Sequence, residues 1–216
     1  MGNSIYGSSV GSLDGVGTSG LGIDLYRLVV DNSLNPDSLV NDGPTLNDLS
    51  DTDTGPNNYI NFPVINSAIQ NSTALTVNFD LDAADSTDGN YRVEFFSNDA
   101  ADSSGYGEGQ TYLGATTVAN GTAQEATLTL ANGTDLTGKS ITATTTAINN
   151  TTASGFGATS EFSEAIAALV TTPATTDTDN LADTGTSVWL YGAGILSILS
   201  VGVYLGFRRS NLGARI

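Results

Sequence analysis

The sequence predicts a mainly β protein: an antiparallel β-sandwich, preceded by a short β-type segment and followed by one apolar span near the C-terminus. Three observations support this fold class. Short runs of alternating apolar and polar residues recur through the middle of the chain, turn dipeptides separate them, and one long uncharged stretch follows them. A soluble helical protein would instead show apolar residues at a spacing of about 3.6.

Residues 59–170 contain the alternating runs, and ALTVNFDL is the clearest, with Leu75, Val77, Phe79 and Leu81 facing one way. Seven strands are predicted: Phe62–Ile69, Ala74–Leu81, Tyr91–Ser97, Thr111–Val118, Ala123–Leu130, Ser140–Ile148 and Ser160–Ala167. This number of short strands favours an antiparallel sandwich of immunoglobulin-like type.

Three dipeptides separate these strands: Asp88-Gly89, Asn120-Gly121 and Asn132-Gly133. Such pairs reach positive φ at low cost, as a type I′ turn requires. We therefore expect hairpins at these points.

Residues 1–58 form a different segment. A short β-type run, GLGIDLYRLVV at 20–30, is followed by turn signals through Asn58, such as NDGP and DTDTGPNN. MGNSIYGSSVG at the N-terminus has neither the basic region nor the apolar region of a secretory signal peptide.

Charge and composition exclude several classes of function. Acidic residues number 23 against 6 basic ones, for a net charge of −17, so nucleic acid and anionic lipid are unsuitable partners. The chain has neither Cys nor His, which excludes disulfides, thiol catalysis and Ser-His-Asp mechanisms. Enzymes that use paired carboxylates remain possible, but no such pair stands out, so the residues predict no enzyme and no catalytic site.

The C-terminal part begins with a Thr-rich spacer at 171–180, too poor in large apolar residues to form a core. Residues 188–207 are uncharged, and a helix of that length spans about 30 Å, the thickness of a bilayer core. Arg208 and Arg209 follow, which predicts a cytoplasmic C-terminal tail and an extracellular N-terminal side.

The pentapeptide LADTG lies just before this span and consists of Leu181, Ala182, Asp183, Thr184 and Gly185. Together with the apolar span and the basic tail, it resembles the cell-wall sorting signal of Gram-positive-type surface proteins, with Ala182 where Pro is commonest. The resemblance implies that a sortase cleaves between Thr184 and Gly185 and joins the chain to peptidoglycan, with Arg208 and Arg209 as the stop-transfer signal. The alternative is a plain single-pass membrane protein.

A second resemblance covers residues 2–168. GNSIYG and DTDTGPNNYINFPVI look like the terminal rung and exit segment of bacterial right-handed parallel β-helix surface proteins, and SGYGEGQTYLG resembles the sandwich module that follows such a helix. This resemblance implies a stalk or adhesin-like protein. One rung cannot bury its own apolar face, so we expect the chain to be the C-terminal part of a longer protein, or Met1 to be a late start.

The acids in NDLSDTDTGPNN suggest a candidate calcium site at Asp48, Asp51 and Asp53, because closely spaced oxygens wrap a hard cation. The spacing departs from the EF-hand pattern, and a solvated turn is the alternative. No other cofactor is expected.

Three functions remain open. The first is a non-enzymatic surface protein serving adhesion or envelope structure. The second is a carbohydrate-binding module with Tyr106, Tyr112 and Phe156 as stacking aromatics. The third is the anchor portion of a larger polysaccharide-acting β-helix protein.

Overall fold

A computed structural model describes residues 4–5, 21–25, 27–28, 39–40 and 43–171 of the chain. These residues belong to the first of the two units into which the chain divides, Met1–Ala174. The second unit, Thr175–Ile216, lies outside the described residues.

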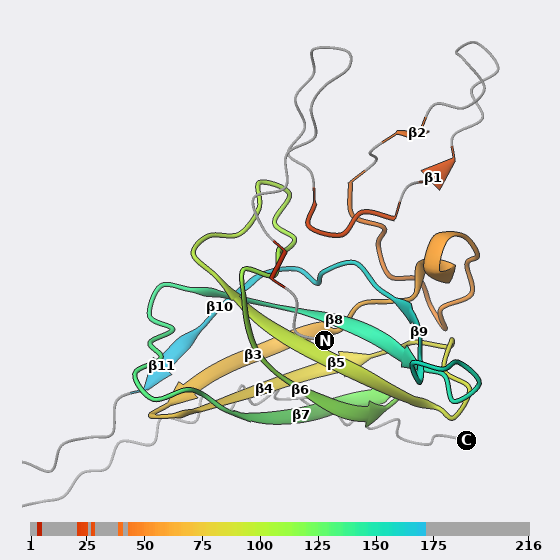
Figure 1. The fold of residues 1–216 in the computed structure, drawn as a ribbon. Helices are drawn as coiled ribbons and strands as arrows, with labels where there is room; N and C mark the ends of the chain where they lie inside the picture. Colours follow the sequence, from red (N-terminus) through yellow and green to blue (C-terminus); the bar gives the residue numbers. More distant parts are fainter. Residues whose placement is uncertain (1–3, 6–20, 26, 29–38, 41–42, 172–216) are drawn as a thin grey trace, which may run out of the picture. The chain divides into compact units, whose positions relative to one another are not determined.

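Two β-sheets form the body of this unit (Figure 1). The four-stranded sheet has the order β11-β3-β4-β7 and consists of β3 (Val64–Asn71), β4 (Ala74–Leu81), β7 (Gly121–Thr129) and β11 (Leu169–Thr171). The five-stranded sheet has the order β10-β8-β5-β6, with β9 also paired to β8, and consists of β5 (Asn90–Asn98), β6 (Thr111–Ala119), β8 (Ser140–Ile148), β9 (Phe156–Thr159) and β10 (Ile166–Ala167). Two smaller features precede them: the antiparallel pair β1 (Arg27–Leu28) and β2 (Leu39–Val40), and the 3-10 turn η1 (Pro56–Tyr59).

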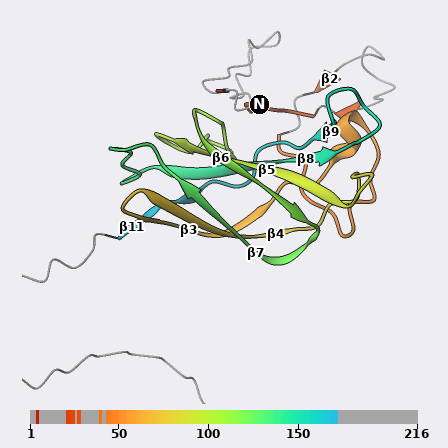
Figure 2. The same cartoon turned by 60° about the horizontal axis from the view of Figure 1, so that its bottom comes forward.

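The core lies between the two sheets, which Figure 2 shows from a second side. The predicted alternation on β4 is confirmed, because Leu75, Val77, Phe79 and Leu81 are all at most 2% exposed. On the facing sheet Phe95 meets Phe79 edge to face, with ring centroids 5.5 Å apart. Burial of these side chains is the main apolar contribution to the stability of the fold.

The prediction of a mainly β protein with two sheets is confirmed. The predicted strands Ala74–Leu81 and Ser140–Ile148 match β4 and β8 end to end, and the next four agree within a few residues. Among the residues described, no helix has the length and apolar character needed to cross a membrane.

The seventh predicted strand, Ser160–Ala167, is wrong. The chain forms β9 before Ser160 and β10 only at Ile166–Ala167. In between, Ser160 and Ser163 each donate a backbone N–H to β8 and accept one from β8 through the side-chain hydroxyl. These hydroxyls replace backbone carbonyls as acceptors, so the segment follows β8 without the geometry of a strand.

The predicted hairpins are also wrong, although the predicted positive φ values are present. Gly89, Gly121 and Gly133 have φ of 77°, 155° and 85°. Each dipeptide, however, lies in a connection between strands that belong to different sheets: β4 to β5, β6 to β7 and β7 to β8. A local turn sequence sets the direction of the chain at the turn, but the pairing of the next strand depends on which sheet buries its apolar face.

Candidate functional site

The predicted acidic site is brought together by the structure. One carboxylate oxygen each from Asp48, Asp51 and Asp53 can be chosen so that all three lie within 4.8 Å of one another. Asp51 is buried at 8% exposure, and the other two are half-buried. Such a set could supply three of the six to eight oxygen ligands that calcium takes.

Hydrogen bonds explain why the loop adopts this shape. Asp51 accepts backbone N–H groups from Asn61 at 2.9 Å and from Ala84 at 2.7 Å, one on each oxygen. Asp48 accepts both the N–H and the hydroxyl of Thr52, at 3.1 and 2.7 Å. The carboxylates therefore already stabilise the loop, and a metal ion is not required to explain their positions.

Burial and the neighbouring acids disfavour the ionised form of Asp51, the central carboxyl of the cluster. Burial raises the pKa of the Asp51 carboxyl above its usual value, and the charges of Asp85 and Asp53 raise it further, while the N–H donors of Ala84 and Asn61 act in the opposite direction. A bound cation would offset the repulsion among these acids. The residues thus fit a hard cation, and the calcium site stays a prediction.

The sorting-signal residues Leu181, Ala182, Asp183, Thr184 and Gly185 lie outside the described residues. The same holds for the apolar span 188–207, for Arg208 and Arg209, and for most of the spacer. The anchoring predictions therefore continue to rest on the sequence.

The three aromatics predicted to stack on carbohydrate do not form one surface. Tyr112 is on β6 and Phe156 is on β9, which lie on either side of β5 and β8 in the five-stranded sheet. Tyr112 packs edge to face on Phe96, with centroids 5.7 Å apart. Of the three, Tyr106 lines a cavity that the other two do not reach.

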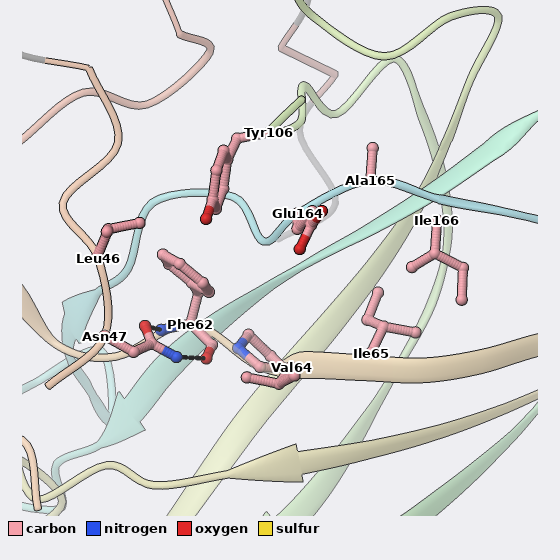
Figure 3. Close-up of a pocket in the computed structure, with 10 residues that line it drawn as sticks. Leu46, Asn47, Phe62, Val64, Ile65, Tyr106, Glu164, Ala165 and Ile166 are labelled. Atoms are coloured by element: carbon pink, nitrogen blue, oxygen red, sulfur yellow. Dashed lines mark hydrogen bonds between the residues drawn. The ribbon is translucent and has the colours of Figure 1, made fainter. Parts of the chain in front are cut away.

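That cavity, here called the Tyr106 pocket, has a volume of about 450 Å³ and lies where β3 of one sheet approaches β10 of the other (Figure 3). Its lining consists of Leu46, Asn47, Phe62, Pro63, Val64, Ile65, Tyr106, Glu164, Ala165 and Ile166. The volume is within the range of small-molecule sites in proteins. Because β11 covers only the C-terminal end of β3, residues 64–68 of β3 are left at the edge of their sheet.

The backbone places Tyr106 and Glu164 side by side. Segments 105–107 and 163–165 pair antiparallel through two hydrogen bonds of 3.0 Å, with Tyr106 opposite Glu164 in the non-hydrogen-bonded position. Side chains at such a position project from the same face and are close neighbours. Figure 3 shows the Tyr106 hydroxyl and the Glu164 carboxylate turned toward the same hollow, above Phe62.

Two glycines that follow Tyr106 allow this approach. A Cβ on Gly107 would lie 2.1 Å from Cγ2 of Thr142 on β8, and one on Gly109 would lie 2.6 Å from the Phe162 ring. Only glycine lets the backbone lie this close to the sheet. Gly107 and Gly109 of SGYGEG therefore have a packing role that positions Tyr106.

The polar side chains of the pocket differ in their hydrogen bonding. Asn47 makes a reciprocal pair with the backbone of Phe62, donating at 2.8 Å and accepting at 3.0 Å. Within the described part of the chain, no hydrogen bond or ion pair reaches the Tyr106 hydroxyl or the Glu164 carboxylate. Burial raises the pKa of Tyr106, and the charge of Glu164 adds to this effect.

Sequence reasoning singled out Tyr106 but missed Phe62 and Glu164 as its neighbours. Phe62 was assigned to a strand, and Glu164 to the strand Ser160–Ala167 that does not form. The rings of Phe62 and Tyr106 meet at 64° with centroids 5.6 Å apart. The glycine pattern in SGYGEG is the sequence signal that indicates a close backbone approach at Tyr106, but it does not identify the residues that Tyr106 approaches.

Comparison with known proteins adds no assignment. No family model matches the sequence, and a search of curated proteins finds no match.

Proposed function

We propose that the chain is a non-enzymatic cell-surface protein that presents the Tyr106 pocket to a ligand and serves adhesion or envelope structure. The observation that favours a binding role is the pocket itself, with apolar walls, two aromatic rings and two polar groups without a described partner. Such a composition is typical of binding sites. Among the described lining residues Glu164 is the one carboxylate, so they do not supply the pair that acid–base catalysis by two carboxylates needs.

The proposed anchor is the sorting signal. A sortase would cleave between Thr184 and Gly185 and join the Thr184 carboxyl to peptidoglycan, after the apolar span 188–207 and Arg208/Arg209 have held the chain in the membrane. The N-terminal side is then extracellular. The order of LADTG, apolar span and basic residues supports this proposal, and the alternative is a plain single-pass anchor.

Mass spectrometry of protein released from the cell wall tests the anchor. We expect the released chain to end at Thr184, with a wall-derived amine attached. A released chain that ends at another residue, or protein recovered only in the membrane fraction with its C-terminus intact, overturns sortase processing.

The finer fold assignment is likewise a proposal. An immunoglobulin-like sandwich is supported by the three-strand orders β3-β4-β7 and β6-β5-β8, and by chain crossings between the sheets. A terminal β-helix rung within residues 1–58 rests on the sequence resemblance. Sequencing the upstream reading frame tests it: further rungs and an export signal are expected, and stop codons directly upstream contradict it.

A carbohydrate-binding module is the second candidate, favoured by the position of Tyr106 in the pocket wall. Binding to a glycan array that is lost in Tyr106→Ala and kept in Tyr112→Ala would favour it, because Tyr112 lies outside the pocket lining. The third candidate, the anchor part of a polysaccharide-acting protein, depends on the upstream frame.

A further inference from the structure

The lining of the Tyr106 pocket limits the charge of its ligand. Among the described lining residues Glu164 is the only carboxylate, and neither Arg92 nor Lys139, the basic residues whose side chains are described, is part of the lining. Both pair elsewhere, Arg92 with Glu94 at 2.9 Å and Lys139 with Asp99. A net charge of −17 adds a long-range field of the same sign, so an anionic ligand is disfavoured and a cationic one attracted.

The hydrogen-bonding capacity of the pocket is small. Asn47 is already paired with the backbone of Phe62, so the Glu164 carboxylate and the Tyr106 hydroxyl are the polar side-chain groups left among the described lining residues. A sugar exposes many hydroxyl groups, and two polar side chains would leave many of them without partners. A primary ammonium is a compact, strongly hydrated charge, and the apolar walls would not replace its lost hydration.

The remaining walls suit a cation that makes no hydrogen bonds. Phe62 and Tyr106 stand at a steep angle to each other, as two walls of an aromatic cage do. Leu46 and Val64 are 65% and 50% exposed at the rim, although both are large apolar side chains. Aromatic rings attract cations at their faces, and quaternary ammonium groups are the ligands bound by such cages.

We infer that the Tyr106 pocket binds a quaternary ammonium group, held by the rings of Phe62 and Tyr106 and by the charge of Glu164. This inference rests on the proposed binding role and names its ligand class. The alkyl groups of the ligand contact the rings and the apolar rim, and Glu164 faces the positive charge without a hydrogen bond. The occupant would be a trialkylammonium group of a surface polymer, lipid headgroup or small molecule.

The test uses the full-length chain in a polyoxyethylene detergent, which contains neither sugar nor amine. Choline is titrated by calorimetry, and its neutral isostere 3,3-dimethyl-1-butanol and the primary amine ethanolamine are titrated in parallel. We expect millimolar or tighter binding of choline, and at least about tenfold weaker binding of the other two.

Two variants test the residues. Glu164→Gln keeps the shape of an exposed side chain, and we expect it to weaken choline binding by about tenfold. The matched control is Glu125→Gln, which removes the same charge from an exposed position on β7 of the other sheet and should leave binding within about twofold. Tyr106→Leu removes the ring but keeps an apolar wall, and it should also weaken binding about tenfold; melting curves of all variants verify the fold.

Three outcomes overturn the inference. They are equal binding of choline and its neutral isostere, equal weakening of choline binding by Glu164→Gln and Glu125→Gln, and no choline binding at about 50 mM. Binding of the neutral isostere alone, or of sugars, would retain the proposed binding role and replace only the ligand class. Phosphatidylcholine vesicles distinguish the sources of the group: binding to both vesicles and soluble choline indicates a lipid headgroup, and binding to soluble choline alone indicates a small molecule or a polymer.

Discussion

The inner core and two of the buried carboxylates, Asp51 and Glu161, hold the sandwich together in different ways. The core is an alternation of apolar side chains, at most 2% exposed on β4. Glu161 is 2% exposed, but it stabilises by accepting backbone N–H groups, from Leu25 at 2.6 Å and from Thr45 at 2.7 Å. Asp51 does the same for Asn61 and Ala84.

The difference shows which interactions position the loops of this protein and which position its strands. The core positions the strands, whereas the carboxylates fix loop residues that are far apart in sequence, including Thr45 and Asn61, which directly precede the pocket residues Leu46 and Phe62. Charged groups respond to pH and to cations, and apolar side chains do not. The loops should therefore be the part of the sandwich that solution conditions change first.

The largest effect is expected from the core. Phe79→Ala removes a fully buried ring that packs on Phe95, and we expect the free energy of unfolding to fall by about 3–5 kcal/mol. Chemical denaturation of the full chain measures it. Leu49→Ala, at an 84% exposed position, is the control and should change stability by less than about 0.5 kcal/mol. Comparable losses in both variants would show that burial does not determine the cost.

Glu161→Gln should lower the free energy of unfolding by about 2–3 kcal/mol. The amide has one acceptor oxygen, so its NH₂ group must face one of the two backbone N–H donors that the carboxylate now accepts. Hydrogen exchange should rise at Leu25 and Thr45 and stay low in β4 and β5. Glu125→Gln is the matched control. Uniform faster exchange across both sheets would contradict a local role for Glu161.

Gly107→Ala tests the close approach that positions Tyr106. The new Cβ would overlap Thr142, and we expect a loss of about 1–3 kcal/mol together with loss of ligand binding in the Tyr106 pocket. In the control Gly157→Ala, the nearest atom to the new Cβ is 3.4 Å away. If Gly107→Ala binds ligand as the unmodified chain does, the position of Tyr106 does not depend on this contact.

Calcium should stabilise the loop that contains Asp48, Asp51 and Asp53. At tenfold above its dissociation constant the gain is about 1.4 kcal/mol, seen as a higher melting temperature. Asp53→Asn should reduce the gain, whereas Asp135→Asn, at an exposed position outside the triad, should not. Absence of both heat and a melting shift at millimolar calcium would remove the site.

The smallest effect is the pH dependence that Asp51 causes. Its pKa is raised above 3.8, so the folded protein binds a proton before the unfolded chain does, and stability from this group rises as pH falls toward 3.8. Below 3.8 the carboxyls of Asp80 and Asp99, whose pKa values are lowered by hydrogen bonds, oppose this trend. As pH falls toward 3.8, the melting temperature of the unmodified chain should rise relative to that of Asp51→Asn. Parallel plots of melting temperature against pH for the two proteins would contradict the raised pKa of Asp51.

Particular residues show what sequence could and could not predict in the site. The triad Asp48, Asp51 and Asp53 was found because its members are close in sequence, within one loop. The pocket pair Tyr106 and Glu164 was missed because a long-range backbone ladder creates it. No local sequence pattern predicts this pairing, because it depends on segment 160–165 not continuing as a regular strand.

The sequence by itself determined the β class, most strand positions and the inward-facing residues of β4, because alternation with a period of two is a local property that burial on one face imposes. Only the tertiary structure decided which sheet each strand joins, where Ser160 and Ser163 replace carbonyls, and that Phe62, Tyr106 and Glu164 surround one pocket. The physical reason is that these features arise from contacts between segments distant along the chain. Such contacts form only when both sheets close over the core.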